Sequence, residues 1–100
     1  MSEFVEKVPS VVQMFEGLTH VSNLEEMLRD AEKGIIFAAL YYADDETIKK
    51  SRKDKSAMLP YILQVEKMDA DEVAKTISFF MGKLAAFSIA IMPKDLSKKK

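Results

Sequence analysis

Residues 69–93, DADEVAKTISFFMGKLAAFSIAIMP, decide the fold that we expect for this chain. Asp69 and Glu72 have the spacing of a capping box at the start of a helix, and Asp71 adds negative charge to the first turn. Pro93 marks the end of the helix. In between, large apolar residues recur at alternating spacings of four and three, which puts them on one side of a helix: Val73, Ile77, Phe80, Leu84, Phe87 and Ile91. We therefore predict one long helix here.

This helix is apolar on nearly all sides. Twelve of the seventeen residues from Thr76 to Met92 are apolar, and Lys83 is the single charge among them. Such a helix must be buried on most sides or cross a membrane. A membrane span needs about 20 apolar residues. This run is shorter and has Lys83 near its middle, so we expect no membrane contact.

A second pattern lies beside the large residues, because small residues recur at every fourth position: Ser78, Gly82, Ala86 and Ala90. Two interpretations are open. The small residues can let the chain's own core pack closely against this helix, or the helix can be shared between two chains. Short neighbouring helices in a 100-residue domain struggle to cover it completely. These four residues are our candidates for self-association.

Two helices are expected before this one. Ser10 and Gln13 form a capping box, which predicts a short helix over 11–18 with Gly17 near its end. Ser22 or Asn23 can cap the next helix, which follows one continuous stripe: Leu24, Leu28, Ala31, Ile35, Ala38 and Tyr42. Residues 35–42 also suit a buried strand. We favour helix because the stripe begins before Gly34 and continues through it.

The middle of the chain completes the expected fold. Asp44 or Asp45 can cap a short helix in the charged stretch 44–55. Residues 56–68 suit a helix with Pro60 in its first turn, whereas a strand over 61–65 would lack an obvious partner. The sequence therefore predicts an all-α bundle of four to five helices, with one domain over 1–93 and a basic flexible tail over 94–100. The residues expected to be most buried are Leu28, Ile35, Ile77, Phe80, Leu84 and Phe87.

The composition fits a soluble globular domain. Apolar residues make up 48% of the chain and charged residues 31%, with a net charge of −1. There is no Cys, which excludes disulfides and Cys-based metal sites, and the acidic start MSEFVEK does not resemble a secretory signal. We therefore expect a cytoplasmic protein. Asn and Gln number three in all while Lys is abundant, a balance that favours a thermophilic source.

The residues needed for catalysis are scarce. His20 is the only histidine, and Glu16 precedes it by four residues at a point where we expect the first helix to end. Three acidic groups (Glu25–Glu26, 44–46 and 69–72) lie where helix starts need negative charge, so capping explains them without a metal. The three glycines are isolated, which excludes a phosphate-binding loop. We predict a protein that is not an enzyme and has no catalytic residues, metal site or cofactor.

A basic segment is the other functional candidate. Five cations fall within residues 49–55: Lys49, Lys50, Arg52, Lys53 and Lys55. Tyrosines 41, 42 and 61 flank the segment, and Lys98–Lys100 could add contacts. Cations beside aromatic rings are typical of single-strand nucleic-acid binding. The alternative is a solvated loop, because the acids of 44–55 reduce that stretch to a net charge of +1.

Two functional hypotheses follow. The first is a non-catalytic interaction or assembly subunit that associates through its C-terminal helix, either as a homo-oligomer or with a partner protein. The second is a small nucleic-acid-associated subunit, for example of a ribonucleoprotein complex, that contacts phosphates through residues 49–55 and the lysine tail.

Overall fold

The computed structural model of the chain, which describes residues 4–21, 25 and 29–91, is a bundle of helices. These described residues contain no strand and form five α-helices and one short 3-10 helix: α1 (Val11–Val21), α3 (Ala31–Tyr42), α4 (Asp45–Ser51), η1 (Lys55–Met58), α5 (Leu59–Glu66) and α6 (Ala70–Ile91). The prediction of an all-α bundle of four to five helices is confirmed. The strand alternatives over 35–42 and 61–65 are wrong.

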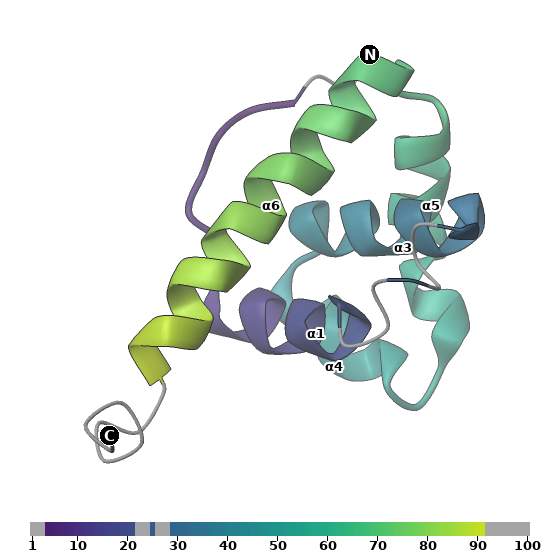
Figure 1. Ribbon diagram of the computed structural model, residues 1–100. Helices are drawn as coiled ribbons and strands as arrows, with labels where there is room; N and C mark the ends of the chain where they lie inside the picture. The colour runs from purple at the N-terminus through teal and green to yellow at the C-terminus, as the bar shows by residue number, and fades with distance from the viewer. Residues whose placement is uncertain (1–3, 22–24, 26–28, 92–100) are drawn as a thin grey trace, which may run out of the picture.

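The longest helix, α6, runs diagonally across one side of the bundle (Figure 1). Both α3 and α1 pack against it at a steep angle, α3 closer to its middle and α1 closer to its C-terminal half. The last turn of α6 extends beyond the other helices (Figure 1). Helix α5 packs on α3, and α4 packs on α1 and η1. One side of α6 therefore meets the bundle while the other has no neighbouring helix in the described part of the chain.

The helix starts follow the sequence signals closely. The backbone N–H of Ser10 donates to Gln13 Oε1 at 2.7 Å, and the N–H of Gln13 donates to Ser10 Oγ at 3.1 Å, so the capping box is confirmed. Asp44 caps α4 by accepting from the N–H of Thr47 at 2.9 Å. Pro60 lies in the first turn of α5, as predicted. The start of α6 is an exception, because the Glu72 carboxylate accepts from the N–H of Phe4 and makes no reciprocal bond with Asp69, which is also a described residue, so the predicted Asp69–Glu72 box is not formed.

The first helix is longer than predicted, because α1 continues to Val21 and Gly17 lies inside it. Gly17 is buried against α6. A Cβ atom at this position would lie 3.0 Å from both Leu84 Cδ1 and Phe80 Cζ, which is tighter than an ordinary contact. The glycine therefore allows α1 to approach α6 closely and does not end the helix.

The second predicted helix is also different, because Asp30 interrupts it. The backbone of Asp30 is extended, with φ −114° and ψ 106°, and its side chain accepts from the N–H of Glu32 at 3.0 Å. A short Asp side chain that bonds the nearby backbone competes with the helix and caps a new one. Helix α3 thus begins at Ala31, and the expected continuous helix from 24 to 42 is wrong. Ser22, Asn23, Leu24 and Leu28 lie outside the described residues.

The core is centred on the C-terminal half of α3, where residues 37–41 are all buried. Phe80 and Leu84 of α6 are buried in it, as predicted. Ile35, Ile77 and Phe87 are only partly buried, so their placement among the most buried residues is wrong. The cause is that α3 is enclosed on all sides near its end, where α1, α5 and α6 meet it, so no single stripe marks its buried residues.

Residues 4–10 form an arm that follows the flank of α6 before α1 begins (Figure 1). The buried Tyr41 hydroxyl holds it, because it donates to the carbonyl oxygen of Val5 at 2.6 Å and accepts from the N–H of Lys7 at 2.8 Å. Burial raises the pKa of Tyr41, which keeps the hydroxyl protonated and able to donate. The Phe4 ring meets the Phe79 ring edge-on at 5.6 Å. The arm is thus fastened to both α3 and α6. The predicted tail, 94–100, lies outside the described residues.

Candidate functional site

The small-residue strip of α6 faces outward. Ser78, Gly82, Ala86 and Ala90 are all exposed, as are Ala85 and Ile89 beside them. No described atom outside the helix's own turns lies within 4 Å of a Cβ placed on Gly82. The interpretation in which the strip packs against the chain's own core is therefore wrong. We call these six exposed residues the α6 face.

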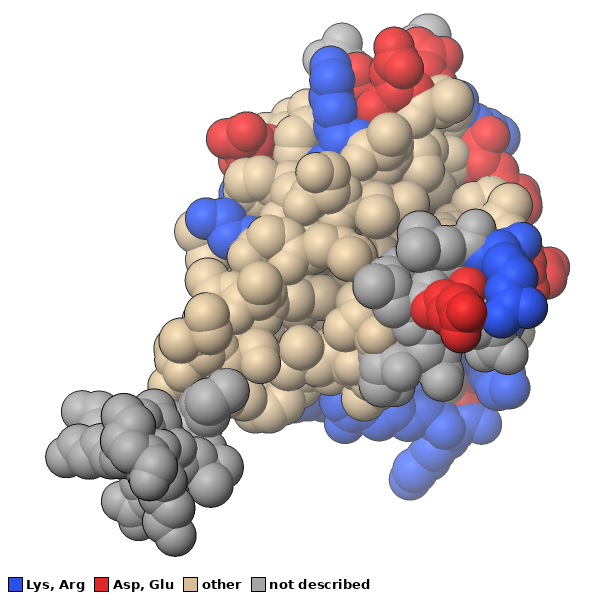
Figure 2. All heavy atoms as spheres, viewed as in Figure 1, with Lys and Arg blue, Asp and Glu red and all other residues tan. Residues whose placement is uncertain are grey.

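Helix α6 is covered on one side only. Of its 22 residues, all of them described, three are buried: Thr76, Phe80 and Leu84. Ile89 leaves 71% of its surface in solvent. Figure 2 shows a broad uncharged surface along this helix, with the charged residues at its edges. An apolar helix that the bundle covers on one side alone leaves an uncharged surface for another molecule to cover.

Exposed apolar side chains also lie where α1 meets the C-terminal half of α6. Phe15 of α1 is 48% exposed, and its ring meets the ring of Phe87 edge-on at 5.2 Å. Val11, one turn earlier on α1, is also exposed. Large apolar side chains are seldom left in solvent as a contiguous group. Phe15 and Phe87 thus form a partly exposed aromatic pair where α1 meets the C-terminal half of α6.

Lys83 does not place a charge in the middle of the α6 face. Its side chain is half-buried, and its Nζ lies 5.2 Å from the centre of the Phe79 ring, within the range of a cation–π contact. Lys83 is the only charged residue between Thr76 and Ile91. The α6 face therefore contains no charge of its own.

Length and composition alone would allow α6 to cross a membrane, and it is the only helix in the described chain that meets this criterion. Core helices of soluble proteins meet the same criterion, but they are mostly buried. Here 17% of the most apolar window is buried. Burial in the chain's own core therefore does not account for the apolar character of α6.

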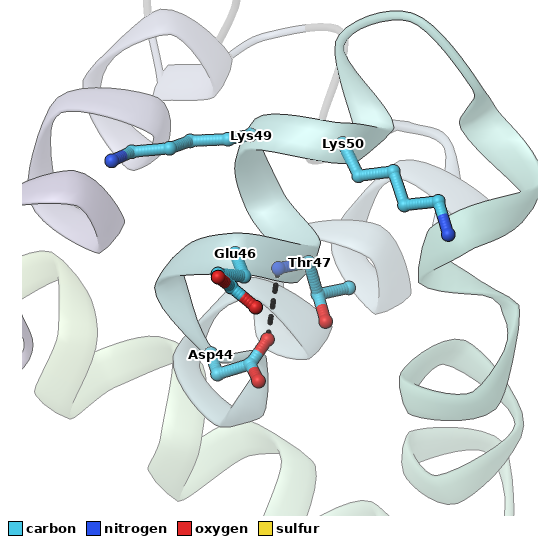
Figure 3. A pocket seen from close by; sticks show the side chains of 5 residues that line it. All are labelled: Asp44, Glu46, Thr47, Lys49 and Lys50. Atoms are coloured by element: carbon cyan, nitrogen blue, oxygen red, sulfur yellow. Dashed lines mark hydrogen bonds between the residues drawn. The ribbon is translucent and has the colours of Figure 1, made fainter.

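The five basic residues of 49–55 are all exposed but do not converge. Lys49 and Lys50 extend in opposite directions from the last turn of α4, and Asp44 and Glu46 lie beside them around the same shallow hollow (Figure 3). Arg52 is paired with Glu16, whose Oε1 lies 3.1 Å from the guanidinium Nε. The hydrogen bonds with Thr47 lower the pKa of Asp44, so this carboxyl stays charged near the lysines.

The tyrosines near this segment do not form an exposed stacking surface. Tyr41 is fully buried, and the hydroxyl of Tyr42 lies 2.7 Å from Thr76 Oγ1, against α6. Tyr61 is half-buried. Lys98, Lys99 and Lys100 lie outside the described residues. The aromatic part of the nucleic-acid hypothesis therefore has no support in this arrangement, because single-stranded bases need accessible rings on which to stack.

Glu16 and His20 share one side of α1, because the helix continues past both of them. Both line a cavity of about 410 Å³ between α1, α3, η1 and α5, next to the end of α4. The expectation that the helix ends between these two residues is wrong. No group of three or more His, Cys, Asp or Glu side chains suited to a metal ion occurs among the described residues.

No family model matches the chain, and no curated protein or solved structure is significantly similar to it.

His20 should make the stability depend on pH. Burial lowers the pKa of His20 below its ordinary value of 6.5; the charge of Glu16 acts in the opposite direction, and that of Lys33 lowers the pKa further. Between the folded pKa and 6.5, the unfolded chain binds more protons than the folded one. The free energy of unfolding should therefore fall as the pH drops from about 7 through 6.5 and on toward the lower pKa of the folded state. Urea melts across this range measure it, and the slope should disappear in His20→Gln. A wild-type stability that rises over the same pH interval would contradict this reasoning.

Proposed function

We propose that this protein is a non-catalytic assembly subunit that pairs with a second copy of itself through the α6 face. One observation carries the proposal: a 22-residue helix has three buried residues, and its uncharged outward side is lined by small and apolar residues. Exposed apolar surface of this kind is typical of interaction sites and is an aggregation hazard when nothing covers it. Small domains often complete their cores by oligomerisation.

A second copy fits because the strip is self-complementary. If two α6 helices cross antiparallel around a two-fold axis on their outward sides, midway between Gly82 and Ala86, Ser78 lies opposite the partner's Ala90, and Gly82 lies opposite the partner's Ala86. Small residues at these positions allow the two backbones to approach closely. In a two-fold pair the same surface is used by both subunits. A surface without charge brings no like-charge repulsion into such a contact.

The nucleic-acid alternative has less support than self-association. Lys49 and Lys50 point in different directions, Arg52 is paired with Glu16, and Tyr41 is buried in the core. We place the protein in the cytoplasm, because the chain has no Cys and so suits a reducing compartment. The amide-poor, lysine-rich composition favours a thermophilic source.

Ala86→Glu tests the proposed pairing. It puts a charge at the centre of the α6 face, where dimerisation would bury it without an opposite charge nearby. The dissociation constant of the dimer should therefore rise more than about tenfold. Because Ala86 is exposed, helicity and the unfolding transition of the monomer should change little. Ala74→Glu is the matched control, since Ala74 is also exposed on α6 but lies in its charged first turns. Sedimentation equilibrium from about 5 to 200 μM measures the dissociation constants of the three proteins.

The expected result is a wild type and an Ala74→Glu variant that dimerise, and an Ala86→Glu variant that is monomeric over this range. A wild type that sediments as a monomer at about 100 μM would rule out the proposal, since a stable apolar interface holds at that concentration. Equal dissociation constants for the two variants would place the interface elsewhere on the surface.

A further inference from the structure

The cavity that contains Glu16 and His20 has a floor and a rim of different chemistry. Its floor consists of apolar side chains from three helices, and two of them are almost fully buried: Ile36, Leu40, Met58 and Ile62. Its rim carries polar and charged side chains, including Arg52 and Lys55. A cavity of about 410 Å³ lies within the range of small-molecule sites, which are mostly apolar with a few polar groups that fix the ligand.

The rim has an excess of positive charge. Arg52 and Lys55 contribute two positive charges, and Glu16 contributes one negative charge. Glu16 Oε1 contacts the Arg52 guanidinium at Nε, 3.1 Å away. A guanidinium has five N–H donors, so one contact at Nε positions the side chain without using all of its hydrogen-bonding capacity. Lys55 is exposed at the mouth of the cavity and adds a cation that can move toward a ligand.

We propose that this cavity binds a small amphipathic anion, a monocarboxylate whose apolar body lies on Ile36, Leu40 and Ile62. The carboxylate would lie at the rim between Lys55 and Arg52. Burying the apolar body supplies the affinity, and the cations select the charged head group. None of the described lining residues belongs to α6, so this site is separate from the proposed self-association surface and goes beyond it.

The arrangement also gives the basic segment a divided role. Arg52 and Lys55 line the cavity, whereas Lys49 and Lys50 line a separate shallow hollow beside Asp44, and Lys53 lines neither. Lys53 and Lys55 are both exposed and lie two residues apart. A long-range effect of the segment's charge would involve both lysines equally, whereas a ligand in the cavity would depend on Lys55. The two residues therefore form a matched pair for a test.

Octanoate is a suitable probe, and octanamide is its neutral counterpart of nearly the same shape. Titrating each into the isotopically labelled full chain, at neutral pH and low salt, gives residue-specific NMR shifts and a dissociation constant. We expect saturable octanoate shifts at the backbone amides of Ile36, Leu40, Lys55 and Ile62. Lys55→Gln should weaken octanoate binding about threefold to fivefold, as expected for the loss of a partly exposed ion pair. Lys53→Gln should leave it within error of the wild type.

The neutral probe and the two lysine variants distinguish binding in the cavity from other kinds of binding. Octanamide should bind more weakly than octanoate to the wild type, and its affinity should be the same in both variants. Octanoate shifts that map to the α6 face would overturn the proposal, because the ligand would then be covering exposed apolar surface. Equal effects of Lys55→Gln and Lys53→Gln would also overturn it. So would a titration that does not saturate by about 20 mM, because a specific site should be saturated below this concentration. Both lysines are exposed, so neither substitution should affect folding.

Discussion

Replacing Phe80 with alanine should lower the free energy of unfolding by about 3–5 kcal/mol, the usual cost of truncating a fully buried phenylalanine. Phe80 has no solvent exposure. Its ring stacks on Phe37 with centroids 4.9 Å apart and meets the ring of Tyr41 edge-on at 5.7 Å. It also lies beside Gly17 of α1, where an added Cβ atom would be 3.0 Å from Phe80 Cζ. The substitution would therefore leave a cavity at the junction of three helices.

Denaturant melts of the wild type and of Phe80→Ala measure this cost. Phe87→Ala is the control, because Phe87 lies two turns further along α6, is partly exposed and contacts Phe15 at the surface. It should cost clearly less than Phe80→Ala, since less apolar surface returns to water. A loss below about 1 kcal/mol for Phe80→Ala would show that the core can close around the missing ring.

Local signals in the sequence were sufficient to predict most helix starts. The Ser10–Gln13 box, the Asp44 cap and Pro60 each act within one helical turn, so neighbouring residues alone determine them. The long α6 was predicted for the same reason, because its acidic start and repeated spacing lie in one continuous stretch. These features need no knowledge of what packs against the helix.

Features that depend on tertiary contacts were predicted less well. Gly17 resembles a helix end in the sequence, but α1 continues because α6 lies against it and leaves no room for a side chain. The apolar stripe over 24–42 gave no sign that the Asp30 side chain would bond to Glu32 and start a new helix. Residues 37–41 are all buried, so their spacing could not show which side faces the core. In each case a contact distant in sequence or a competing cap decides the outcome.

The two candidate sites also differ in how far the sequence could predict them. The small residues of the α6 face were found by their spacing, but two orientations fitted the sequence equally well, and only the packing of α1 and α3 separates them. The cavity that contains His20 could not be found from the sequence, because its lining comes from elements spread over residues 16–62. One signal was available: Glu16 and His20 are four residues apart, the spacing that puts two side chains on one side of a helix.

Gln13 has a second role that its capping box did not reveal. Its side chain is 5% exposed, and its Nε2 lies 3.0, 2.8 and 2.9 Å from the carbonyl oxygens of Leu40, Tyr41 and Ala43. These carbonyls belong to the last turn of α3 and the residue after it, which have no further helical N–H groups to bond. The side-chain amide of Gln13, on α1, therefore donates hydrogen bonds to the carbonyl groups at the C-terminal end of α3, the most buried helix.

Gln13→Glu should consequently lower the free energy of unfolding by about 3 kcal/mol or more at neutral pH. The substitution keeps the shape of the side chain but replaces two donors with a carboxylate that faces three carbonyl oxygens. An unpaired buried charge and unsatisfied acceptors are each costly in the low dielectric of a core. Burial facing carbonyl oxygens raises the pKa of this carboxyl in the folded state. Because protonation restores one donor and removes the charge, the cost should shrink as the pH falls from 7 toward about 4, the ordinary pKa of a glutamate in the unfolded chain, and should be smallest below it.

Gln64→Glu provides the control, since Gln64 is the only other glutamine and lies half-exposed on α5. It makes the same chemical change where water can reach the new carboxylate, so its cost should stay within about 1 kcal/mol. Urea melts at pH 7 and near pH 4 measure both variants beside the wild type at each pH. If the two substitutions cost the same at pH 7, Gln13 does not hold the end of α3. If the cost of Gln13→Glu is the same at both pH values, the loss comes from packing rather than from the buried charge.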